Sequence, residues 1–177
     1  MNKLSPKPFD IVLVNTHTPL AFLQRLVYKI QNHPTHISHV GIMYSNTLIF
    51  EAHTHLRIIP ISKLNINDIA LLRIKACNNI DIESFKILCE QLYGMEYDYL
   101  QLINDLYYLF TDKAMGSRQK FVCSELVAYI IKQICGDIIY KELFGDIDTR
   151  IVMPYHFATL KKHNNVELIY QGKNFKW

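Results

Sequence analysis

The chain has 177 residues, of which half are hydrophobic and a fifth are charged, and its formal net charge is +3. This composition is typical of a globular domain and excludes a disordered chain. The charge is small and no arginine-rich stripe occurs, which excludes a dedicated nucleic-acid-binding protein. We therefore expect one domain, residues 1–177, with no nucleic-acid partner.

The N-terminus and the cysteines indicate the cellular compartment. The first fifteen residues, "MNKLSPKPFDIVLVN", contain only a short apolar run that Asp10 interrupts, unlike a signal peptide. Other apolar runs are far shorter than the roughly 20 residues that span a bilayer. The four cysteines form no C-x-x-C pair, which argues against a zinc ribbon, and they are too few for a disulfide scaffold. We predict reduced thiols in a cytoplasmic protein.

The residue pattern in the first half of the chain predicts strands interspersed with helices. A β-branched strand over Asp10–Asn15 precedes a helix over Pro19–Asn32 that begins with proline. Next come two strands, "HISHVGIMY" and "TLIFEAHTHLRIIP", around turn residues Ser45 and Asn46. A short strand, "IALLRIK", and an amphipathic helix, "DIESFKILCEQLYG", follow, and Cys89 lies on the apolar side of that helix.

The second half is predicted to be mainly helical. The aromatic segment "YDYLQLINDLYYLF" has helical period; core packing is one explanation of its apolar stripe and a lipid-facing wall is the other. A helix over Phe121–Gly136 follows, then irregular segments and a last strand, Val166–Gln171. Hairpin-linked strands with separate helices indicate an α+β fold with an antiparallel sheet.

Cys123 lies at the front of the helix that ends at Gly136. Ser124 and Glu125 place polar groups in the first turn, and apolar residues recur at three- and four-residue spacing behind them. The free N–H groups of a helix N-terminus stabilise a thiolate and can hold an oxyanion during acyl transfer. A buried structural cysteine is the alternative, so a catalytic interpretation needs a base elsewhere in the chain.

A base and an orienting carboxylate are predicted in the hairpin. If Tyr44, Ser45 and Asn46 form a three-residue loop, Met43 pairs with Thr47, and His39 lies directly opposite Glu51. A carboxylate there can hold one imidazole nitrogen and leave the other for Cys123, as covalent catalysis requires.

Histidines crowd the same region, which raises a metal site as a rival. His36 and His39 are three residues apart and face opposite sides of a strand, whereas His53 and His55 share a face with Glu51. Exposed polar residues near a strand end explain the latter pair as well, and we expect neither a metal nor a cofactor.

Four blocks resemble the circularly permuted NlpC/P60 group of papain-like proteins: "ISHVGIM", "LIFEAHTHLRIIPI", "YDYLQL" and "FVCSELVAY". That group includes bacterial members and poxvirus homologues, with lecithin–retinol acyltransferases as distant relatives. The likeness covers roughly residues 9 to 130 and has the permuted order, with His39 before Cys123. It implies Cys123 as nucleophile, His39 as general base and acid, and Glu51 as the third polar residue.

The resemblance also implies a substrate cleft and departs from the family in two places. The cleft would involve Tyr97, Asp98 and Tyr99. Phe9 stands where the family often has glycine, and the Asn-Cys-Glu-His-Phe signature of the acyltransferase branch is absent. A hydrolase of the bacterial or poxvirus type is therefore better supported than a lipid acyltransferase, and the poxvirus likeness adds a virion to the candidate settings.

The expected activity is that of a cysteine hydrolase that cleaves an amide, ester or thioester through an acyl-enzyme. The backbone N–H of Cys123 would stabilise the oxyanion, with Tyr97 or His17 as the second donor. The partner would be a peptide or lipid-type acyl substrate, with peripheral membrane contact as an option and the oligomeric state left open. Two alternatives remain: a lipid acyltransferase with the same triad, and a non-catalytic module that binds a peptide, lipid or protein.

Overall fold

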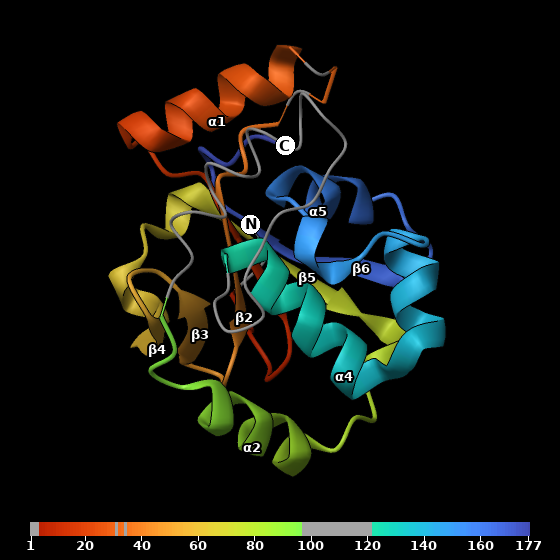
Figure 1. Cartoon of the computed structure of the whole chain (residues 1–177). Coiled ribbons are helices and arrows are strands. Elements are labelled where there is room, and N and C mark those ends of the chain that lie inside the picture. Colours follow the sequence, from red (N-terminus) through yellow and green to blue (C-terminus); the bar gives the residue numbers. More distant parts are fainter. Residues whose placement is uncertain (1–3, 31, 34, 97–121) are drawn as a thin grey trace.

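A computed structural model describes residues 4–30, 32–33, 35–96 and 122–177 (Figure 1). Its centre is a six-stranded sheet in the order β4-β3-β2-β1-β5-β6, with every neighbouring pair antiparallel. The strands are β1 (Ile11–Val14), β2 (His39–Met43), β3 (Leu48–Ala52), β4 (Leu56–Pro60), β5 (Ile69–Ile74) and β6 (Val166–Gln171). The α+β class with an antiparallel sheet is thus as predicted.

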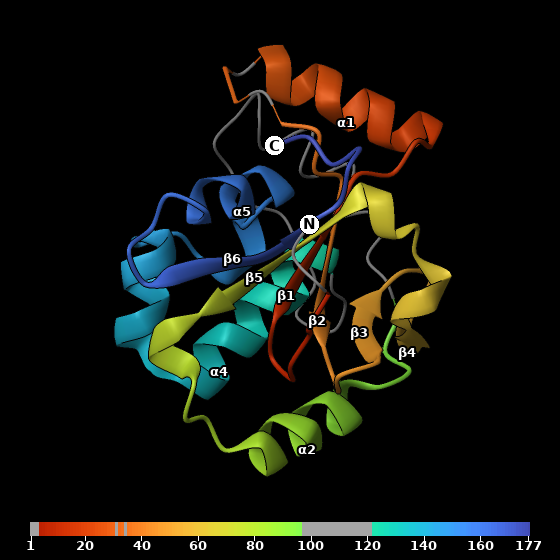
Figure 2. The same cartoon turned by 180° about the vertical axis from the view of Figure 1, so that it is seen from behind.

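Alternation along the strands divides the core into two layers. In β1, Ile11 and Leu13 belong to the larger apolar cluster, whereas Val12 and Val14 belong to the smaller one on the other face. Two helices, α2 (Ile82–Leu92) and α4 (Cys123–Phe144), contribute to the larger cluster, and Cys89 is fully buried in it. Figure 2 shows α4 behind the sheet, and α1 (Pro19–Ile30) beyond one end of it.

The chain differs from the sequence-based expectation in three places. Residues 47–60 form two strands rather than one, because His53, Thr54 and His55 separate β3 from β4. Gly136 does interrupt the Cys123 helix, with φ of 83°, but the helix resumes and continues to Phe144. It resumes because Tyr140, Leu143 and Phe144 are buried at helical spacing. A further helix, α5 (Pro154–Leu160), replaces part of the segment predicted to be irregular.

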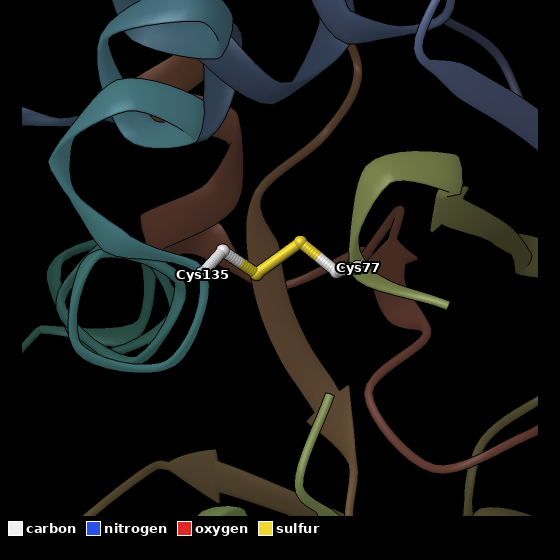
Figure 3. Close-up of a disulfide and its surroundings, with 2 residues drawn as sticks. All are labelled: Cys77 and Cys135. Carbon is white, nitrogen blue, oxygen red and sulfur yellow. A yellow bond between two sulfur atoms is a disulfide. The ribbon is translucent and has the colours of Figure 1, made fainter. Parts of the chain in front are cut away.

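The prediction of four reduced cysteines is wrong for two of them. Cys77, just after β5, and Cys135, just before the break at Gly136, form a disulfide with a Cα–Cα distance of 6.0 Å (Figure 3). Their separation of 58 positions hides the pairing in the sequence. Cys89 and Cys123 are free.

Within the described ranges, no helix combines the length and the apolar character needed to cross a membrane.

Candidate active site

Cys123 is the first residue of α4 and lines a cavity of about 570 Å³. Val122 precedes the helix in an extended conformation and offers no side-chain hydrogen bond to the first turn. The N–H groups of that turn therefore receive no capping group from Val122, as a site that must hold a developing negative charge requires.

His39 joins Cys123 to Glu51. It is the first residue of β2, so its ring lies at an end of the sheet. The ring Nε2 lies 2.8 Å from Glu51 Oε2, and the ring lines the same cavity as Cys123, whose thiol raises the pKa of His39. Since Nε2 is taken by the carboxylate, Nδ1 is the nitrogen left for the sulfur. The structure thus brings together three residues that the sequence places 12 and 72 positions apart.

The predicted hairpin register is wrong by two residues, although the predicted contact forms. Met43 pairs with Ile49 and Gly41 pairs with Glu51, because the loop is longer than three residues. Ser45 Oγ accepts from the N–H groups of Thr47 and Leu48 and so stabilises the wider loop. A shift of two preserves the face of every side chain.

Gly41 lies beside the diagonal pair that His39 and Glu51 form. It lies directly opposite Glu51 and two residues from His39, on the same face as both. A Cβ at this position would lie 2.8 Å from Ile49 Cγ2 and 3.6 Å from Glu51 Cβ. The absent side chain leaves the space that the Ile49 side chain occupies beside Glu51.

Arg57 is a residue of the site that sequence reasoning missed. It lies opposite Glu51 on β4, and its Nε and Nη2 donate to Glu51 Oε1 at 2.9 and 2.7 Å. Glu51 therefore divides its oxygens, one for Arg57 and one for His39. The side chain of Glu51 is only 3% exposed, and a buried carboxylate needs a cation. That need was the available signal, but the unrecognised turn at residues 53–55 hid the partner.

The pKa of His39 is raised and the pKa of Glu51 is lowered. Burial would lower the pKa of His39, but the charge and hydrogen bond of Cys123 and those of Glu51 outweigh it and raise the pKa well above 6.5. Burial would raise the pKa of Glu51, yet the hydrogen bonds and charges of His39 and Arg57 hold it below its usual value. The site thus favours the charged form of His39, with Glu51 as its ionised partner.

Of the predicted substrate-binding residues, only His17 is described, and it does not line the cavity. The His17 side chain is 73% exposed, and its Nε2 lies 3.9 Å from Asp68 Oδ1; Thr16 and Thr18, on either side of it, line the cavity instead. His17 is thus unsuited to the role of second oxyanion donor. Tyr97, Asp98 and Tyr99, and the predicted aromatic helix that begins with them, lie outside the described residues.

The crowded histidines do not form a metal site in the described ranges, where no three His, Cys, Asp or Glu side chains are grouped to hold an ion. His33 instead stacks on Tyr155, with ring centroids 4.6 Å apart. His53 lines the cavity, and burial together with the charge of Arg57 lowers its pKa.

Comparison with solved structures bears on the fold. The chain is similar to the crystal structure of the metalloprotein YiiX from Escherichia coli O157:H7, a DUF1105 protein, with a TM-score of 0.61. The two share 14% sequence identity over 94% of this chain and 98% of that one. No protein-family model and no curated protein matches the sequence. The chain has the α+β fold with an antiparallel sheet that the sequence predicts, and it shares this fold with YiiX.

Proposed function

We propose that this protein is a cysteine hydrolase of the permuted NlpC/P60 type that cleaves an amide, ester or thioester bond. The observation that carries the proposal is the position of His39, whose Nε2 is held by Glu51 and whose ring lines one cavity with Cys123. Nucleophile, base and orienting carboxylate meet at one cavity, which is the arrangement that covalent catalysis uses.

The chemistry proceeds in two halves. The Cys123 proton moves to His39 Nδ1, the thiolate attacks the carbonyl carbon, and the backbone N–H of Cys123 donates to the oxyanion. The tetrahedral intermediate collapses, His39 gives its proton to the leaving group, and an acyl-enzyme remains. Water then loses a proton to His39 and attacks the acyl carbon. The acid product leaves, and the proton returns to the sulfur.

Glu51 stays ionised throughout and acts through His39. Arg57 fixes one of its oxygens, so the other keeps a constant position on Nε2. The imidazolium that forms during each half-reaction is thereby stabilised and held in one orientation.

Metal chemistry, which the description of YiiX raises, is less well supported here. Both oxygens of Glu51 are already engaged by His39 and Arg57, and the described residues contain no grouped set of three donor side chains.

We propose a virion-associated rather than a cytoplasmic setting. The expectation of a cytoplasmic protein rested on reduced thiols, and the Cys77–Cys135 disulfide removes that support. Disulfides are rare in cytosolic proteins and persist at virion and cell surfaces.

The test is to trap the acyl-enzyme. The protein is incubated with amide, ester and thioester acyl probes, and mass spectrometry identifies the residue that gains the acyl mass. We expect an adduct on Cys123 in the wild type and none in His39→Gln, with Cys89 unmodified in both. Added alcohol or amine acceptors then separate transfer from hydrolysis. If no probe modifies Cys123, the binding module replaces the enzyme as the better account.

A further inference from the structure

Helix α1 carries an exposed apolar pair on its outer face. Phe22 is 68% exposed and Leu26, one turn later, is 46% exposed. Lys29 continues the same face by another turn and is also exposed. The opposite side of the helix is buried through Ala21 and Tyr28. Apolar side chains thus point outward from a helix whose inner face is already packed.

This helix also borders the candidate active site. Thr18, just before α1, and Ala21 and Gln24 within it line the cavity that contains Cys123 and His39. In Figures 1 and 2, α1 lies beyond the end of the sheet, apart from α2 and α4. A surface that met the outer face of α1 would therefore lie next to the opening of the cavity.

Basic residues outnumber acidic ones around α1, where Asp68, 3.9 Å from His17 Nε2, is a neighbouring carboxylate. Residues 11–50 contain no aspartate or glutamate, whereas Arg25 and Lys29 lie on α1 itself. Burial lowers the pKa of His36, and the nearby charges of Arg25, Lys176 and His17 lower it further. The C-terminal Lys176 thus adds to the same positive region.

We propose that α1 docks the protein on an anionic lipid surface, with Phe22 and Leu26 inserted among the acyl chains and Lys29 facing the phosphates. Apolar residues flanked by cations on one helical face are the features of an interfacial helix. Two side chains cover far less than the roughly 800 Å² per partner of a stable protein interface, which favours a membrane over a second copy or another protein. The docking does not require the chemistry of Cys123.

Vesicle co-sedimentation tests this proposal with matched variants. The full chain is mixed with phosphatidylcholine vesicles that contain or lack phosphatidylserine. The double variant Phe22→Ser/Leu26→Ser is compared with Ile87→Ser/Ile138→Ser, which removes two apolar side chains, 47% and 83% exposed, from α2 and α4. Lys29→Glu tests the charge, and Cys123→Ser tests independence from catalysis.

We expect the wild type to bind the phosphatidylserine vesicles, and binding to weaken with added salt. Phe22→Ser/Leu26→Ser lowers partitioning about tenfold or more, and Lys29→Glu lowers it about fivefold or more. Ile87→Ser/Ile138→Ser and Cys123→Ser bind like the wild type. The proposal is overturned if the wild type binds neither kind of vesicle. It is also overturned if the two double variants bind the phosphatidylserine vesicles equally well. A concentration-dependent dimer that only Phe22→Ser/Leu26→Ser abolishes also overturns it, in favour of a second copy.

Discussion

Two buried carboxylates, each held by an arginine from a neighbouring strand, lie in the two regions that contrast most in this molecule. Asp10, before β1, receives Arg73 Nε on Oδ1 and Arg73 Nη2 on Oδ2, both at 2.7 Å. Its Oδ2 also accepts from the backbone N–H of Lys7 at 2.8 Å. Arg73 belongs to β5, and both residues line a second cavity of about 480 Å³ together with Cys77. This region lacks a nucleophile with a base beside it among the described residues.

Glu51 differs in how its oxygens are shared. Arg57 places both of its donors on Oε1 and leaves Oε2 to His39. A carboxylate–arginine pair therefore forms a closed structural link in one region and holds an orienting carboxylate in the other. The comparison teaches that the division of the carboxylate oxygens, rather than burial or the presence of arginine, distinguishes the two roles.

Removal of the disulfide should have the largest effect on stability. This bond lies in the region of Asp10 and Arg73, where Cys77 lines the second cavity. Cys77→Ser/Cys135→Ser releases a loop of 58 residues and should lower the free energy of unfolding by about 4 kcal/mol on the chain-entropy estimate. Urea unfolding measures the loss. Alkylation of Cys123 under native conditions should keep its wild-type rate, because the disulfide lies away from the Cys123 cavity. A large change in that rate would show that the two regions are coupled.

Asp10→Asn should lower the free energy of unfolding by about 3 kcal/mol, because it leaves the charge of Arg73 without its partner in a largely buried position. Thermal or urea unfolding measures the change. Acylation of Cys123 should be unaffected below the unfolding transition. If the variant instead loses reactivity while it keeps its stability, the structural assignment of this pair fails.

Glu51→Gln should show the reverse pattern. The amide keeps the shape but no longer stabilises an imidazolium, so acylation of Cys123 should slow about a hundredfold. The loss of stability should be smaller than in Asp10→Asn, because Arg57 is nearly twice as exposed as Arg73 and can turn to solvent. Glu167→Gln, at an exposed position, is the matched control. An acylation rate equal to that of the control would remove Glu51 from the site.

The smallest effect is a pH dependence of the difference in stability between the wild type and Glu51→Gln. The lowered pKa of Glu51 gives a contribution that is present above 4.5 and lost as the pH falls through the folded value. The raised pKa of His39 gives one that is present below 6.5 and lost as the pH rises through its folded value. The difference should therefore be widest between 4.5 and 6.5. Urea unfolding over a pH series measures it, and a constant difference would contradict the ion pair.

Local patterns in the sequence were sufficient for the helix that begins at Cys123 and for the shared face of His39 and Glu51. The prediction that His39 and Glu51 share a face holds despite the incorrect register, because a shift of two residues preserves the face of every side chain. A shift of one residue would place them on opposite faces. The register itself depended on Ser45 Oγ, which stabilises a wider loop than the one assumed.

Contacts between distant segments could not be predicted in the same way. Arg57 became a neighbour of Glu51 only through the turn at residues 53–55, which separates two strands that had been read as one. The Cys77–Cys135 bond joins a segment after β5 to the break in α4, and nothing in the spacing of four cysteines selects that pair. The segment with Tyr97, Asp98 and Tyr99 stays a prediction.

The most direct test of the central claim, that His39 activates Cys123, is the rate of iodoacetamide alkylation at each free cysteine near neutral pH. Cys89 is the internal reference, because burial and the neighbouring charge of Glu90 raise its pKa to about 12. The account predicts that Cys123 reacts much faster than Cys89 in the wild type and loses most of that advantage in His39→Gln. Equal rates at Cys123 in the two proteins, or no alkylation of Cys123 in either, would contradict it.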